Sequence, residues 1–211
     1  MSACTGAVSR SMDQQVGSTR RPYRKTRRAD DERRTRARIV DAAETLHGSV
    51  GPAHASIAAV ARTAGVTRAT VYRHFPDDES LFQACSAQWL ARQRRPDPDR
   101  WTVHPDAEER LTAGLTDVYR YYREGAAMLR LVIRDAEVVP EAVRAARLGA
   151  ERAWVETMLE PFPGRSRVRR TAVTHAVSFA TWQSLCVDGG LSDRSAVALM
   201  TAMVREAGLR P

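Results

Sequence analysis

The sequence predicts an all-α protein of about nine helices, with a small N-terminal three-helix unit followed by a larger helical domain. Apolar residues recur at helical spacing through most of the chain, and no segment shows the alternation typical of strands. Proline and glycine separate the helical segments. With 211 residues and 43% hydrophobic content, the chain can bury a core. We expect a disordered basic arm at 1–30, the three-helix unit at 31–77 and the second domain at 78–211.

The first 30 residues are rich in Ser, Thr, Gly and Arg and lack a periodic apolar pattern, which predicts disorder. A first helix is expected over 31–46, because apolar residues repeat at i, i+3, i+4 and i+7 from Ile39 to Leu46. Gly48 and the residues after it should end this helix.

Residues 56–75 predict two short helices joined by a glycine turn. Ser56 and Thr67 are N-cap residues for the first and second helix. Gly65 supplies the left-handed conformation that ends the first helix. Pro76 disfavours helical conformation in the residue before it and so closes the second helix.

The second of these helices carries cationic and hydroxyl groups around its sides and exposed face. These residues are Arg68, Ala69, Thr70, Tyr72 and Arg73. A helix of about two turns, held by a partner helix and carrying such groups, suits the DNA major groove. The alternative is an ordinary corner between two helices of an all-α protein, without DNA contact.

Positive charge is concentrated at the N-terminal end. Residues 1–38 hold 11 Lys or Arg against 4 Asp or Glu, which leaves +7 of the net +8 there. A localised basic block leading into the motif favours a nucleic-acid partner. A solvated tail in an arginine-rich chain is the alternative.

The remaining chain predicts helices with apolar stripes, and prolines at 96 and 98 suggest a hinge before the second domain. The expected helices cover residues 79–94, 105–123, 126–136, 140–159, 166–187 and 193–207.

Residues 38–85 resemble the DNA-binding domain of the TetR family of transcriptional regulators. The resemblance lies in RIVDAAETL, SIAAVARTAGVTRATVYRHF and PDDESLF, and it covers roughly a quarter of the chain. It implies an N-terminal DNA-binding domain, a C-terminal domain for ligand binding and dimerisation, and a regulator, more often a repressor than an activator. His47 and Pro52 stand where the family usually has aromatic residues, and Ala69 where it often has glycine.

Residue chemistry and the resemblance together suggest roles on DNA. Arg68 is the candidate for a bidentate guanine contact, and Ala69 can approach a base edge or a thymine methyl. Tyr72 resembles the family's phosphate-contacting tyrosine, although it could instead be a half-buried support beneath the helix. The other candidates, expected at phosphates or flanking bases, are Ser56, Thr67, Thr70, Arg73 and His74 in the motif and Arg24, Lys25, Arg27 and Arg28 in the arm.

One recognition helix contacts too little DNA for useful specificity, so we expect a two-fold dimer on a symmetric operator. The last two predicted helices offer apolar stripes for an intersubunit four-helix bundle. These stripes comprise Ala172, Val173, Ala176, Val177, Ala180 and Leu185, and then Val197, Met200 and Val204. The alternative is that both stripes face the subunit's own core.

The resemblance also implies a small-molecule effector that releases DNA, and an apolar pocket would suit a hydrophobic or aromatic molecule. The candidate ligand contacts are Tyr119, Tyr122, Met128, Trp154, Met158, His175, Phe179 and Trp182. Each of them is also a candidate core residue. Helix 79–94 is the expected lever between the two domains.

Other classes of function find little support. The sequence has no phosphate-binding glycine loop, metal-ligand cluster or recognisable catalytic set, so we expect neither an enzyme nor a metal or cofactor. No segment is long and apolar enough to cross a membrane, no secretory signal is evident, and three widely spaced cysteines suit a reducing cytoplasm. The remaining rival is a sequence-independent architectural DNA-binding protein that relies on the arginine-rich arm.

Overall fold

The computed structural model describes the backbone of residues 20–207 and the side chains of residues 26–207. Within that range the chain is all-helical, in agreement with the predicted fold class. It divides into two compact units, residues 1–37 and residues 38–211, which are described separately. Among the described residues, no helix combines the length and apolar character needed to cross a membrane.

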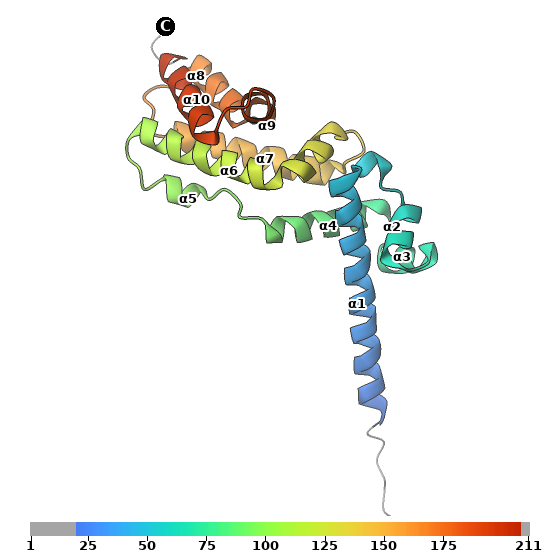
Figure 1. Ribbon diagram of the computed structural model, residues 1–211. Coiled ribbons are helices and arrows are strands. Elements are labelled where there is room, and N and C mark those ends of the chain that lie inside the picture. The colour runs from blue at the N-terminus through green and yellow to red at the C-terminus, as the bar shows by residue number, and fades with distance from the viewer. Residues whose placement is uncertain (1–19, 208–211) are drawn as a thin grey trace, which may run out of the picture. The chain divides into compact units, whose positions relative to one another are not determined.

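The helices of the described residues are labelled as in Figure 1. They are α1 (Arg20–Ser49), the short 3-10 turn η1 (Pro52–His54), α2 (Ile57–Ala64), α3 (Arg68–His74), α4 (Asp78–Arg92), α5 (Pro98–Trp101), α6 (Ala107–Arg134), α7 (Glu141–Leu159), α8 (Arg167–Val177), α9 (Phe179–Trp182), the π-helical turn η2 (Gln183–Asp188) and α10 (Asp193–Ala207).

The predicted disorder of residues 1–30 is wrong for its second part, because α1 begins at Arg20 rather than at residue 31. Arginine is a good helix former and needs no apolar stripe to adopt the conformation. Oppositely charged pairs one turn apart add local support, as between Arg28 and Glu32 at 3.3 Å. Residues 1–19 lie outside the described residues.

A first small core lies in the second unit and joins the end of α1 to α2, α3 and the start of α4. Ile39, Val60, Val71 and Phe75 are almost fully buried in it. The predicted helical spacing therefore identified the inward faces of these helices correctly. Burial of these side chains holds α3 against α2 and α1.

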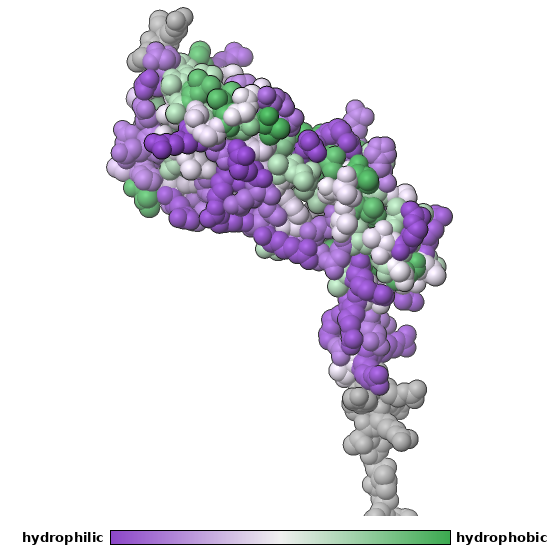
Figure 2. Space-filling model, viewed as in Figure 1, coloured by the Kyte–Doolittle hydropathy of each residue, from purple (hydrophilic) through white to green (hydrophobic). Residues whose placement is uncertain are grey.

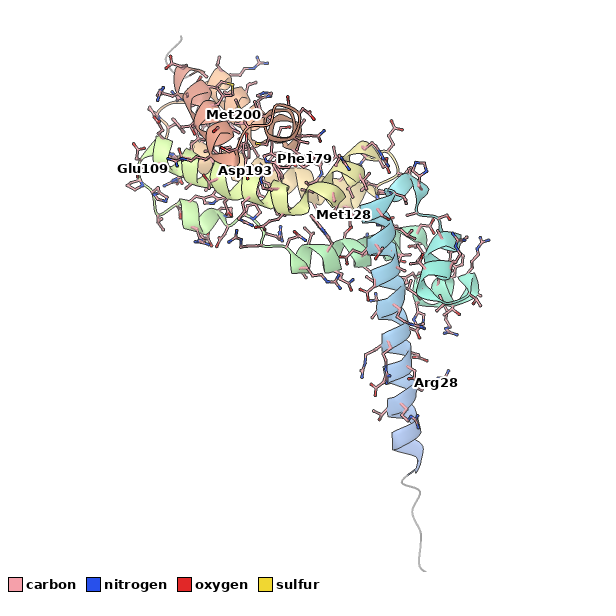
Figure 3. The ribbon with its side chains drawn as sticks, in the orientation of Figure 1. Arg28, Glu109, Met128, Phe179, Asp193 and Met200 are labelled. Atoms are coloured by element: carbon pink, nitrogen blue, oxygen red, sulfur yellow. The ribbon has the colours of Figure 1, made fainter. Side chains whose placement is uncertain are left out.

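The second core is built from the long helices α6 and α7 with α8, α9 and α10 packed against them (Figure 1). Asp193, at the start of α10 where this helix meets α6, ties the two together (Figure 3). Its carboxylate accepts hydrogen bonds from Arg123 of α6 and from the indole of Trp182. Burial raises the pKa of Asp193, but the bonds from Arg123 and Trp182 outweigh it and the net shift is downward.

The predicted break between helices 105–123 and 126–136 is wrong, because α6 runs unbroken through this region. Gly125 is buried inside the helix and faces the Trp89 ring of α4. A Cβ atom at this position would lie 3.0 Å from a Trp89 ring carbon. The glycine therefore permits close packing of two helices and does not end one.

The single helix predicted at 166–187 is also wrong, since α8 ends at Val177 and α9 starts anew. The hydroxyl of Tyr119 donates to the carbonyl of Ala176 at 2.9 Å, and that of Tyr122 donates to Val177 at 2.7 Å. These donors from α6 satisfy carbonyls at the end of α8, so the chain can interrupt the helix inside the core.

The apolar stripes predicted as a dimer interface mostly face the subunit's own core, which was the alternative. The nearly fully buried members are Val173, Ala176, Val177, Val197, Met200 and Val204. They are needed there because α10 packs on both α6 and α8. The exposed large apolar residues of α8 and α10 are instead Val168 and Leu199, and Figure 2 shows apolar surface over these two helices.

Candidate DNA interface and effector cavity

The turn between α2 and α3 has the predicted cap geometry. The Ser56 side chain accepts a hydrogen bond from the amide of Ala59, and Gly65 adopts φ 65° in the left-handed region. The Thr67 hydroxyl oxygen accepts from the amide of Thr70 at 3.1 Å, and the two threonine hydroxyls are 2.9 Å apart. These local bonds orient the start of α3 before any DNA contact is made.

The outer face of α3 is accessible. Arg68, Ala69 and Arg73 are exposed, whereas Val71 points into the core. Tyr72 is 43% exposed, which leaves part of its ring accessible. The helix therefore presents two guanidinium groups and a phenol on the side away from its partner helix.

Two of the predicted DNA-contacting residues, His74 and Ser56, are less available for a contact with DNA. The Nε2 atom of His74 is buried and has no hydrogen-bond partner among the described residues, and the side chain is only partly accessible. Ser56 is exposed but uses its oxygen as the cap of α2, which leaves its hydroxyl hydrogen to donate to a phosphate.

The arm candidates belong to the first unit. Arg27 and Arg28 are exposed, and Arg28 pairs with Glu32 on the next turn of α1. An exposed pair of this kind contributes little to stability and can exchange its partner for a phosphate. Arg24 and Lys25 lie in the helical backbone of α1, but their side chains fall outside the described ones.

The second unit contains a cavity of about 330 Å³ between the end of α1, α4, α6 and α7. Five aromatic side chains form part of its wall, together with aliphatic residues of α6 and α7. The aromatic residues are Phe82, Trp89, Tyr121, Tyr122 and Trp154. A mostly apolar space of this size suits a small apolar molecule.

Three of the eight predicted ligand contacts line this cavity: Tyr122, Met128 and Trp154. The other five, Tyr119, Met158, His175, Phe179 and Trp182, do not line it. Four of these five are buried in the second core, and His175 is exposed on α8. Aromatic and sulfur-bearing residues fill the core and the cavity wall alike, so residue type could not separate the two.

The polar wall residues absent from the predicted ligand contacts include His47, Arg95, Tyr121, Arg147 and Glu151. His47 could have been recognised from the sequence, because it stands at a position where the family usually has an aromatic residue. The other four could not be recognised, because they come from the segment after α4 and from two helices that meet only in the fold.

His47 lies beside Phe82, with 4.6 Å between the ring centroids, and its Nδ1 atom is 3.2 Å from the Cys85 sulfur. Burial lowers the pKa of His47 to about 4, so the imidazole is neutral near pH 7. Burial likewise raises the pKa of Cys85 to about 12, which keeps the thiol protonated and unreactive. This part of the wall therefore carries no charge.

Two links connect the cavity helices with the DNA-binding part of the second unit. At the end of α6, Asp135 accepts a hydrogen bond from the amide of Ala53, and Arg134 donates to the carbonyl of Val50. The bond from Arg134 is the largest cause that lowers the pKa of Asp135 to about 2. Helix α4 is the second link, because it starts next to α3 and carries Trp89 into the cavity wall.

Comparison with known proteins identifies the N-terminal motif and the overall fold. Residues 39–85 match the model of the bacterial regulatory proteins of the tetR family. Two uncharacterized HTH-type transcriptional regulators of Mycobacterium tuberculosis are 33% identical to the chain over 91 residues, 43% of this chain and 45% of theirs. The chain thus spans about half the length of the curated relatives it matches.

The fold extends beyond the matched segment. A TetR family transcription regulator of Marinobacter aquaeolei aligns with 86% of the chain and 97% of its own, at a TM-score of 0.54 and 21% identity. NalD of Pseudomonas aeruginosa, the secondary repressor of the MexAB-OprM multidrug efflux pump, aligns with 84% of the chain and 96% of its own, at a TM-score of 0.50 and 22% identity. Residues 39–85 therefore carry the motif of the TetR family of helix-turn-helix transcriptional regulators, and the fold around the motif is that of solved TetR family regulators.

Proposed function

We propose that this protein is a repressor that binds a two-fold symmetric DNA operator as a homodimer and is released by a small apolar effector. The observation that carries the proposal is the accessible face of α3, with Arg68, Tyr72 and Arg73 exposed on a helix whose other side is buried. Arginine forms bidentate bonds with guanine in the major groove, and the phenol of Tyr72 can donate to a phosphate.

The phosphate contacts come from the start of α2 and α3. The hydroxyls of Ser56, Thr67 and Thr70 lie at or near helix N-termini, where the backbone amides favour an anion. Arg27 and Arg28 of α1 add cationic contacts to the backbone or the minor groove. These contacts position the protein, whereas Arg68 and Ala69 select the sequence.

The dimer forms through the outer faces of α8 and α10. Val168 is 55% exposed on α8 and Leu199 is 47% exposed on α10, although both sit on helices that already fill the core with their other faces. A symmetric pair of such helices buries these residues and gives two copies of α3 for two half-sites.

The effector acts through the cavity and the two links described above. A molecule that enlarges or reshapes the space beside Trp89 moves α4, and one that displaces α6 strains the bonds of Arg134 and Asp135 to the turn after α1. Either movement changes the position of α3. The effector can lower DNA affinity only as far as it prefers the shape that does not fit the operator.

Selection of bound duplexes from a random pool by the purified full-length protein at physiological salt tests the proposal. Enrichment of an inverted repeat, with half-sites about one helical turn apart, is the expected result. Enrichment of single half-sites would contradict the dimer.

The arginine-rich arm favours one alternative, a sequence-independent architectural protein. That protein would retain bulk DNA without enriching any sequence, and its affinity would fall steeply with salt for every duplex tested. The same selection experiment therefore separates the two functions.

A further inference from the structure

Two polar groups of the cavity wall have no bonding partner in the part of the chain that the structure describes. They are the guanidinium of Arg95 and the hydroxyl of Tyr121. Tyr121 is buried for all but 7% of its surface, and it packs between the rings of Trp89, Tyr122 and Trp154. Its hydroxyl therefore has a fixed position at the cavity and no protein acceptor.

Arg95 and Tyr121 both line the cavity. Burial raises the pKa of Tyr121 to about 12, and the nearby charge of Arg95 partly opposes this effect. The phenol is consequently a hydrogen-bond donor at neutral pH. Arg95 is exposed and lines the cavity, so its guanidinium can offer two parallel N–H groups to a ligand.

The other polar side chains of the wall are already engaged. Arg147 donates to Glu151 at 2.7 Å, and Gln83 donates to Glu79 at 3.0 Å. His47 and Ser86 both interact with Cys85. The two groups without a partner, the guanidinium of Arg95 and the hydroxyl of Tyr121, can both donate hydrogen bonds to a ligand.

The formal charges of the cavity wall also favour a ligand that accepts hydrogen bonds. Two arginines line the cavity against one glutamate, and His47 is neutral, which leaves one net positive charge. A ligand with one negative charge balances it. A phosphate dianion would carry further oxygens that the aromatic wall cannot bind.

We propose that the cavity takes an aromatic or aliphatic carboxylic acid whose carboxylate is bound by Arg95 and Tyr121 while its apolar body packs between Trp89 and Trp154. This inference rests on the proposed function, since it names the chemical class of the effector. The carboxylate accepts the two guanidinium N–H groups and the phenol O–H, and these charge-assisted bonds are the stronger kind of hydrogen bond. The apolar body fills a space that water occupies poorly.

Three probes with the same ring test the charge preference. Naphthoate, the neutral naphthamide and the cationic naphthylmethylammonium are titrated into the full-length protein by calorimetry. Naphthoate should bind at least about tenfold more tightly than naphthamide, because bonds to a charged group contribute more than neutral ones. The ammonium compound should bind most weakly.

Variants identify the groups responsible. Arg95→Gln should lower the affinity for naphthoate to that for naphthamide, and Tyr121→Phe should remove part of the preference while the ring stays in place. Arg94→Gln is the matched control, because the neighbouring Arg94 pairs with Glu124 at 3.2 Å and does not line the cavity. It should retain the preference for naphthoate in full.

Equal binding of the three probes, binding of none of them at millimolar concentration, or a preference for the ammonium compound would overturn the inference. A naphthoate preference that survives Arg95→Gln would overturn it too. Adding naphthoate to the protein on its selected operator separates this inference from the proposed function. Tight binding without DNA release leaves the ligand class intact and contradicts the effector mechanism. Specific DNA binding without naphthoate binding leaves the DNA-binding function intact and contradicts the ligand class.

Discussion

The DNA-binding motif and the proposed effector cavity are built in opposite ways. In the motif, residues close in sequence form the structure: Thr67 caps α3 through Thr70, and the exposed groups follow within one short helix. In the cavity, the wall joins residues as distant in sequence as His47 and Trp154. The motif can therefore be recognised from consecutive residues, whereas the cavity exists only once four helices have packed.

The two regions should also respond differently to substitution. The outer face of α3 is exposed, so its side chains can change with little effect on folding. The cavity residues are packed on other core groups, so their replacement changes stability as well as ligand binding. Four predictions test how sharply the two regions divide in this respect.

Deletion of residues 1–30 should have the largest effect, because it removes several basic side chains at once, among them Arg24, Lys25, Arg27 and Arg28. Operator affinity should fall, and the slope of log affinity against log salt should decrease by about 0.9 for each phosphate that the arm neutralises in the intact protein. Sequence preference should stay the same. Binding titrations at several salt concentrations measure the slope.

Deletion of residues 1–19 is the matched control, since it retains all of α1 and these four basic residues. It should keep most of the salt dependence. An unchanged slope after deletion of residues 1–30 would mean that the arm does not contact DNA.

Acid should destabilise the protein through His47. Because the pKa of its buried imidazole is about 4 and that of an unfolded histidine about 6.5, the unfolded state binds more protons between these values. The free energy of unfolding should therefore decrease as pH falls from about 6.5 to about 4, by up to about 3 kcal/mol from this group. Denaturant unfolding at several pH values measures the decrease.

His47→Phe should lose this part of the pH dependence, because phenylalanine retains the ring beside Phe82 and has no proton to gain. His175→Phe is the control at an exposed histidine on α8, and its profile should follow that of the parent chain. Identical profiles for His47→Phe and the parent chain would contradict the assignment.

Arg68→Ala should reduce operator affinity by about 10- to 100-fold, as expected when one bidentate base contact is removed. It should also relax the preference at one base pair of each half-site. The thermal midpoint should not change, because Arg68 is exposed. Arg152→Ala on α7 is the control for an exposed arginine outside the motif, and equal losses of affinity in both variants would argue against base contact by Arg68.

Tyr122→Phe should have the smallest effect, a loss of about 1–2 kcal/mol in unfolding free energy, because it leaves the buried carbonyl of Val177 without its donor. Operator affinity should be retained. Tyr121→Phe is the control in the adjacent residue, since its hydroxyl has no protein partner among the described residues and its removal should cost little stability. Equal destabilisation by both variants would show that the loss of unfolding free energy comes from altered ring packing and not from the lost hydroxyl bond.

The sequence by itself determined the all-helical class, the caps at Ser56 and Thr67, the turn at Gly65 and the buried face of α3. These features depend on side chains within one or two turns of each other, so spacing alone reveals them. It also identified the family, because the motif is a continuous segment.

Tertiary structure decided the rest. Gly125 continues α6 because Trp89 of another helix packs on it, and α8 ends at Val177 because tyrosines of α6 take up its last carbonyls. The same holds for the stripes of the last helices, which fill the core, and for the cavity, which Arg95 and Tyr121 line together. In each case the deciding partner comes from a different helix, and only packing of the whole chain brings the two together.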